Sequence, residues 1–102
     1  MFDLTDKAAL ITGATGGIGE EIAKSLHSQG AIVGISGRNV DKLNKLAAEL
    51  GERVHILPAD LSNDEAVKDL VKRADEAMGK IDILVNNAGI SLSSGSSYDE
   101  DT

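Results

Sequence analysis

Residues 8–19, AALITGATGGIG, determine how the rest of this chain is interpreted. An apolar run ends at Thr12, and four glycines follow just before a segment with helical spacing: Gly13, Gly16, Gly17 and Gly19. The pattern predicts a buried strand, a tight turn and the start of a helix. Such a turn directs backbone N–H groups and the positive end of the helix dipole at one place, which suits a phosphate or pyrophosphate. An ordinary glycine-rich turn without a ligand is the alternative, although each glycine costs backbone entropy on folding.

Composition limits the function. The chain has 102 residues, enough for one domain, with 41% hydrophobic and only 2% aromatic residues. An aliphatic core of this kind suits a buried parallel sheet and provides no stacking surface for single-stranded nucleic acid. The net charge of −7 argues against a surface for a nucleic-acid backbone. The sequence contains no cysteine and no apolar run long enough to span a membrane, so we expect a cytoplasmic protein that binds neither nucleic acid nor membrane.

Apolar runs and helical stripes alternate along the chain. We expect strands at 7–12, 31–36, 53–57 and 81–85, and helices at 18–29, 40–50 and 63–78. Asn39 is the expected N-cap of the second helix, and Ser62 with Glu65 has the spacing of a capping box for the third. This β-α-β-α-β-α-β order with short connections favours right-handed crossovers and a parallel sheet.

The composition changes at Ser91. Residues 91–102, SLSSGSSYDEDT, contain five serines, three acids and a single aliphatic residue. A segment with so little to bury is predicted to be a flexible tail. The expected organisation is therefore a half-domain at 1–90 followed by a serine-rich, acidic tail at 91–102.

Three motifs occur in a specific order: TGATGGIG at 12–19, Asp60-Leu61 after the third strand, and NNAG at 86–89 after the fourth. Together they resemble the short-chain dehydrogenase/reductase superfamily over residues 4–90. Within it, LTDKAALITGATGGIGEEIAK and IDILVNNAGI are most similar to bacterial 3-oxoacyl-[acyl-carrier-protein] reductases. The resemblance implies a Rossmann-like α/β fold, a parallel sheet with helices on both faces and strand order 3-2-1-4, which is half of a doubly wound fold.

The resemblance also implies residues that bind a dinucleotide. The pyrophosphate turn would consist of glycines and of neighbours that offer backbone contacts: Gly13, Thr15, Gly16, Gly17, Ile18 and Gly19. Asp60 and Leu61 would flank the adenine. Asn86 would join the fourth strand to its neighbour through its side-chain amide. The ribose would lie along Asn87, Ala88 and Gly89.

The end of the second strand indicates which dinucleotide binds. NAD-preferring sites have a carboxylate there, which accepts hydrogen bonds from the ribose hydroxyls and repels a 2′-phosphate. This chain has Gly37 at that position, followed by Arg38. A glycine leaves room for the phosphate, and a guanidinium can hold it through two hydrogen bonds. We therefore predict NADP(H) rather than NAD(H), with a solvated turn cation as the alternative role of Arg38.

Catalysis in the family depends on a Ser, a Tyr, a Lys four residues after the Tyr, and a further Asn, all beyond the region that corresponds to Ile90. The only tyrosine here, Tyr98, is followed four positions later by Thr102 instead of Lys. No catalytic residue is therefore assigned, and the chain is expected to be inactive on its own. His27 and His55 have no partners at metal-ligand spacing, so no metal site is predicted.

The strand edge at 81–85 is apolar, and the strand that should pair with it is missing from the sequence. Either the chain is a fragment or this edge pairs with another copy or a partner. Our main hypothesis is the NADP(H)-binding N-terminal portion of a short-chain reductase of fatty-acid synthesis. The alternatives are a non-enzymatic Rossmann fragment or scaffold, and an S-adenosylmethionine-dependent methyltransferase, which the glycine spacing and NNAG disfavour.

Overall fold

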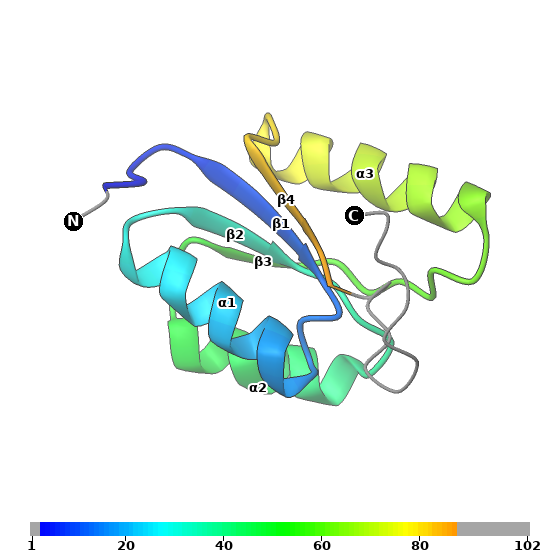
Figure 1. Cartoon of the computed structure of the whole chain (residues 1–102), viewed down its shortest axis with the longest axis horizontal. Helices are drawn as coiled ribbons and strands as arrows, with labels where there is room; N and C mark the ends of the chain where they lie inside the picture. The colour runs from blue at the N-terminus through cyan, green and yellow to red at the C-terminus, as the bar shows by residue number, and fades with distance from the viewer. Residues whose placement is uncertain (1–2, 88–102) are drawn as a thin grey trace.

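The computed structural model describes residues 3–87, which form a four-stranded sheet with α1 and α2 on one face and α3 on the other (Figure 1). The elements are β1 (Ala8–Thr12), α1 (Gly17–Ser28), β2 (Ile32–Ile35), α2 (Val40–Leu50), β3 (Val54–Ile56), α3 (Asp64–Met78) and β4 (Ile83–Asn86). All strand pairs are parallel, and the order is β3-β2-β1-β4. The predicted Rossmann-like α/β fold and strand order are confirmed. The predicted tail at 91–102 lies outside the described residues.

Strand β1 lies at the centre of the fold, and all five of its residues are buried. Alternate side chains point to opposite faces of a strand, so β1 contributes to two cores. Ala9 and Ile11 pack with the residues beneath α1 and α2, whereas Leu10 packs with Leu70 and Ala74 of α3. The near-continuous apolar run that predicted a strand buried on both faces is therefore explained.

Strand β4 begins at Ile83, two residues later than expected, and Asp82 just before it makes two hydrogen bonds to Ala8, the first residue of β1. The Asp82 N–H donates to the carbonyl of Ala8 at 2.8 Å, and Asp82 Oδ2 accepts from the Ala8 N–H at 2.9 Å. The hydrogen bond from the Ala8 N–H to the carboxylate, with a smaller contribution from the ammonium of Lys80, holds the pKa of the Asp82 carboxyl below its usual value. The two hydrogen bonds with Ala8 set the register in which the two strands start.

The N-caps of the helices confirm one prediction and correct another. Asn39 caps α2 as expected, accepting from the N–H of Lys42 at 3.1 Å. The capping box at Ser62 and Glu65 is wrong: the cap of α3 is Asn63, whose Oδ1 accepts from the N–H of Ala66 at 2.9 Å. Asparagine is as good a cap as serine, and with the helix starting one residue later Glu65 no longer occupies the position from which it would reach back.

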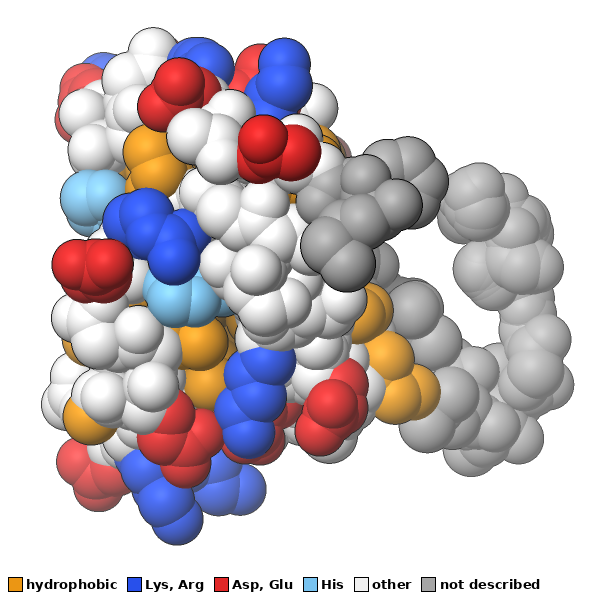
Figure 2. All heavy atoms as spheres, turned by 90° about the vertical axis from the view of Figure 1, so that its left-hand side faces the viewer, with side chains coloured by type: hydrophobic (Ala, Val, Ile, Leu, Met, Phe, Trp, Pro, Cys, Tyr) orange, Lys and Arg blue, Asp and Glu red, His pale blue; other side chains and the backbone are white. Residues whose placement is uncertain are grey.

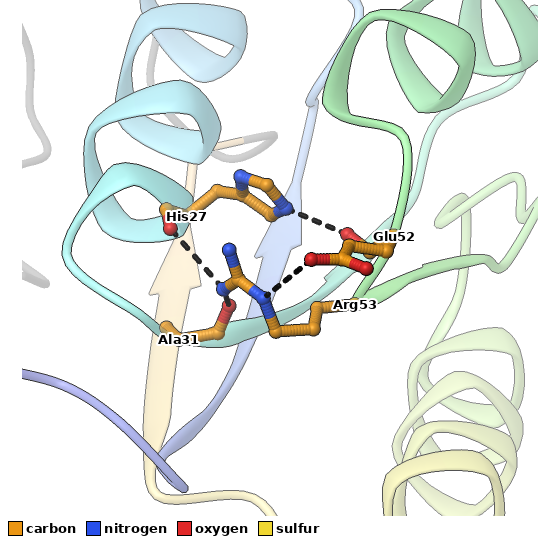
Figure 3. A network of polar contacts seen from close by, with 4 residues as sticks. All are labelled: His27, Ala31, Glu52 and Arg53. Carbon is orange, nitrogen blue, oxygen red and sulfur yellow. Dashed lines mark hydrogen bonds and ion pairs between the residues drawn. The ribbon is translucent and has the colours of Figure 1, made fainter.

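The edge of the sheet at which the strands begin is held by the side chain of Arg53 (Figure 3). Its Nη1 donates to the carbonyls of His27 at 3.2 Å and Ala31 at 2.8 Å, and the His27 ring donates from Nε2 to the carbonyl of Glu52 at 2.6 Å. Figure 2 views the molecule from the left of Figure 1, the side on which these strands begin. Among the described residues on that face, side chains of both charges are mixed.

The corrected cap gives a direct test. Asn63→Ala removes the acceptor for the Ala66 N–H and should lower the free energy of unfolding by about 0.5–2 kcal/mol. Ser62→Ala, at the adjacent exposed position, should change it by no more than about 0.5 kcal/mol. Urea unfolding of both variants measures this. If Ser62→Ala lowered the free energy of unfolding more than Asn63→Ala, Ser62 would be the cap and the capping box would be correct.

Candidate functional site

The loops that follow β1, β2 and β3 meet at the carboxyl edge of the sheet and enclose a cavity of about 490 Å³. Its lining residues are Gly13, Thr15, Ser36, Gly37, Arg38, Ala59, Asp60, Leu61 and Ser62. Two backbone hydrogen bonds join the loops, from Ala14 N–H to the Ser36 carbonyl at 2.9 Å and from Ala59 N–H to the Gly37 carbonyl at 3.0 Å. Predicted cofactor residues from three separate segments therefore lie around one space: Gly13, Thr15, Arg38, Asp60 and Leu61.

Two glycines of the turn are required by the fold. Gly13 has a φ of 64°, in the left-handed region that favours glycine. Gly19 is buried, and a Cβ added there would overlap the carbonyl oxygen of Gly13 and lie 2.9 Å from Asn87 Nδ2. The first turn of α1 can approach the end of β1 this closely only without a side chain at Gly19.

Gly16 and Gly17 have no such structural role. A Cβ at Gly17 would meet no atom within 4 Å, and one at Gly16 would make only an ordinary contact, 3.6 Å from the Gly13 carbonyl oxygen. Both residues are exposed and neither has a positive φ. Contacts within the fold therefore explain why two of the four positions are glycine. The backbone at the other two, Gly16 and Gly17, is exposed.

The N-terminus of α1 differs from those of the other helices. Its cap is Gly16, which has no side chain to accept from the first N–H groups, whereas α2 and α3 have asparagine caps. The N-terminal end of a helix carries a partial positive charge and unpaired N–H donors. At α1 this end is available to an external acceptor such as a phosphate oxygen.

The two asparagines after β4 connect to the glycine turn. Thr12 Oγ1 donates to Asn86 Oδ1 at 3.2 Å, which confirms that the Asn86 amide joins the fourth strand to its neighbour. Asn87 Nδ2 donates to the Gly13 carbonyl at 3.1 Å, a contact that the sequence did not predict because no spacing rule relates the two motifs. The predicted ribose residues Ala88 and Gly89 lie outside the described residues.

Arg38 and Gly37 lie at the mouth of the cavity. The Arg38 side chain is exposed and makes no ion pair with any of residues 3–87. The room expected beside Gly37 is partly taken, because a Cβ there would lie 3.3 Å from both Oγ1 and Cγ2 of Thr15. The lack of a side chain at Gly37 therefore accommodates Thr15.

Sequence reasoning overlooked Ser36, which ends the apolar run AIVGIS. This residue is almost fully buried, lines the cavity, and has a hydroxyl with no hydrogen-bond partner among residues 3–87. The signal available in the sequence was a polar residue at the carboxyl end of a buried strand.

No three potential metal ligands come together within the part of the chain that the structure describes. None of the described helices combines the length and apolar character needed to cross a membrane.

The glycines can be separated by their effect on stability. Gly19→Ala should lower the free energy of unfolding by about 1–3 kcal/mol, because the new methyl group overlaps backbone atoms. Gly17→Ala should leave it unchanged or raise it by up to about 1 kcal/mol, since the methyl group meets open space and restricts the unfolded chain. Chemical denaturation of the two variants tests this. Equal losses would show that Gly17 also has a structural role.

Comparison with known proteins agrees with this arrangement. The family described as short chain dehydrogenase matches residues 7–102. Nodulation protein G of Rhizobium sp. (strain N33) is 60% identical over 90 residues, which is 88% of this chain and 37% of that protein. The chain thus spans little more than a third of that relative's length.

Two solved structures share the fold. The 3-ketoacyl-(acyl-carrier-protein) reductase from Brucella melitensis, complexed with NADH, matches with a TM-score of 0.80 and 43% identity over 86% of this chain and 36% of that one. The hydroxysteroid dehydrogenase from Escherichia coli matches with a TM-score of 0.78 and 37% identity over 82% and 36%. The glycine turn, the strand order and these matches lead to one conclusion: the chain belongs to the short-chain dehydrogenase family.

Proposed function

We propose that residues 1–90 are the dinucleotide-binding half-domain of an NADP(H)-dependent short-chain reductase, of the 3-oxoacyl-[acyl-carrier-protein] reductase type that serves fatty-acid synthesis. The main support is the cavity at the carboxyl edge of the sheet, around which the glycine turn, Arg38 and the Asp60-Leu61 loop come together. In open parallel sheets, ligands bind outside the carboxyl ends of the strands, where the strand order reverses. Here the order reverses at β1, which lies between β2 and β4.

The pyrophosphate would bind at the N-terminus of α1. Gly16 and Gly17 are not needed by the fold, and their exposed backbone permits the close approach of an anion. Thr15 and Ile18 would add backbone contacts on either side. Because α1 lacks a side-chain cap, its first N–H groups can bind phosphate oxygens without displacing a protein acceptor.

The adenosine would occupy the cavity between Arg38 and Asp60. The Asp60 carboxylate can accept a hydrogen bond from an adenine amino group, and Leu61 offers apolar contact to the ring. The ribose that follows the pyrophosphate would lie along Asn87, Ala88 and Gly89. A bound dinucleotide would supply a hydride for carbonyl reduction, and the residues of this chain would hold the dinucleotide in place.

The preference for NADP(H) rests on charge. Arg38 lies at the cavity and has no carboxylate partner within residues 3–87, so its guanidinium is available to a 2′-phosphate. Gly37 places no acid where an NAD-preferring site would have one. The Brucella melitensis reductase was obtained with NADH, so both dinucleotides need to be compared on this chain.

The reductase type rests on sequence similarity. Identity is higher with the ketoacyl reductase, at 43%, than with the hydroxysteroid dehydrogenase, at 37%. The resemblance assigns the Ser, Tyr and Lys of carbonyl reduction to a region outside residues 1–90, so the role proposed for residues 1–90 is to bind the cofactor. The cytoplasmic location expected from the sequence is part of the same proposal.

A fluorescence titration of NADPH tests this function. The wild-type chain should bind NADPH saturably and more tightly than NADH. Arg38→Glu should weaken NADPH binding roughly 10- to 100-fold, since it removes a charged hydrogen bond to the phosphate, and should reverse the preference. Lys72→Glu makes the same charge change at an exposed position on α3 and should leave both affinities unchanged.

The outcomes distinguish the hypotheses. A folded, monodisperse chain that binds neither dinucleotide would favour the scaffold alternative. Unchanged NADPH affinity in Arg38→Glu would show that Arg38 does not contact the cofactor. It would not contradict binding at the glycine turn. Carbonyl-dependent oxidation of NADPH by the pure chain would contradict its predicted inactivity.

We also propose that the chain associates with itself through the strand edge at 81–85. Within the described sheet β4 pairs only with β1, and its Leu84 side chain is 57% exposed. Val67 and Val71 of α3 are exposed beside it, and together these side chains line an apolar cavity of about 230 Å³. An unpaired strand edge next to exposed aliphatic side chains favours pairing with another strand.

Sedimentation velocity tests the association. Leu84→Lys should shift the wild-type oligomer to monomer, because a charged side chain on an edge strand opposes pairing. Val40→Lys is the control: Val40 is 45% exposed on α2, on the other face of the sheet. A wild-type chain that is monomeric at high concentration would contradict this proposal.

A further inference from the structure

The dinucleotide cavity contains a polar side chain with unfilled hydrogen-bonding capacity. Ser36 is 1% exposed, and its Oγ is the buried side-chain polar atom within residues 3–87 that has no hydrogen-bond partner. Its backbone is fully used, because the N–H donates to the Ile11 carbonyl and the carbonyl accepts from Ala14 N–H, both at 2.9 Å. Of the polar groups of Ser36, only the hydroxyl lacks a partner in the described part of the chain.

The position of Ser36 at the end of β2 directs this hydroxyl into the cavity. Val33 and Ile35 pack into the core under α1 and α2, whereas a Cβ at Gly34 would point at Leu57 and Met78 on the α3 side. Continuing the alternation places the Ser36 side chain on the α3 side, toward the loop of Ala59 to Ser62. That loop forms the opposite wall of the same cavity.

A buried hydroxyl without a partner destabilises the fold, because its lost hydration is not replaced by a hydrogen bond. An alanine at this position would carry no such penalty. The other buried polar side chain of the described chain, Thr12, does have partners, Val85 and Asn86. A buried hydroxyl without a partner in the wall of a ligand-sized cavity therefore indicates that the missing partner belongs to the ligand.

We propose that Ser36 Oγ hydrogen-bonds the adenosine end of the bound dinucleotide and thereby fixes how deeply that end enters the cavity. This inference rests on the proposed function. The adenosine end is specified because Ser36 lines the cavity with Arg38 and Asp60, and the lining does not include Gly16 and Gly17, the exposed glycines that suit the pyrophosphate. A serine hydroxyl both donates and accepts, so it can pair with a ring nitrogen, an amino group or a ribose hydroxyl.

The test compares affinity with stability in Ser36→Ala. The dissociation constants for NADPH and for ADP should both rise about three- to tenfold, since a single neutral hydrogen bond is lost. The melting temperature of the unliganded variant should equal or exceed that of the wild type, because no intramolecular bond is broken. Ser25→Ala, an exposed serine on α1, should change none of these quantities. Ser36→Cys, similar in size but a poor hydrogen-bond partner, should behave like Ser36→Ala.

Each other outcome overturns the inference. Unchanged affinity in both variants would show that the hydroxyl does not contact the ligand, as would be the case if it bound only an internal water. A lower melting temperature of both unliganded variants would reveal an intramolecular partner. Weaker binding of NADPH with unchanged binding of ADP would show that Ser36 does not contact the adenosine end. A wild-type chain that binds neither nucleotide would overturn the proposed function together with this inference.

Discussion

The close approach of Gly19 to the carbonyl of Gly13 is the constraint on which the site depends. Any side chain at Gly19 would overlap that carbonyl, and Asn87 Nδ2 donates to the same oxygen at 3.1 Å. This contact places the first turn of α1 directly beyond the end of β1 and attaches the end of β4 to it. The N-terminus of α1 is thereby held, without a side-chain cap, at the edge of the sheet where a dinucleotide would bind.

The sheet provides the rigidity that this arrangement needs. Strand β1 is buried on both faces and pairs on both sides, so the turn that follows it has little freedom. The beginnings of the strands are fixed separately, by the hydrogen bonds of Asp82 with Ala8 and by the Arg53 side chain. Hydrogen bonds thus fix the strands at the edge where they begin, and the backbone groups exposed by the glycine turn lie at the opposite edge.

Much of the fold could be predicted because its signals are local. The alternation of apolar runs and helical stripes predicts the order of strands and helices. Asn39 is predicted as a cap because it stands directly before an apolar stripe. The cap of α3 was misassigned to Ser62 because Ser62 and Asn63 are adjacent and both are good N-cap residues. Such one-residue choices depend on backbone angles, which a sequence pattern does not specify.

The site was less predictable, because its contacts join distant segments. The resemblance supplied Asp60, and the residue types at the end of the second strand supplied Arg38. No pattern indicated that Asn87 would bond to Gly13 or that Thr15 would occupy the space beside Gly37. Ser36 was overlooked because its importance lies in a hydrogen bond that no described residue makes to its hydroxyl. Only coordinates show which polar atoms lack partners.

The central claim is that the carboxyl edge of this sheet holds a dinucleotide. The most direct measurement is a titration of the ¹⁵N-labelled chain with NADPH, followed by backbone amide chemical shifts. The account predicts saturable shifts at Gly16, Gly17 and Arg38, and none at His27 or Arg53 on the opposite edge. Shifts absent from the glycine turn, or confined to the edge near Arg53, would contradict it.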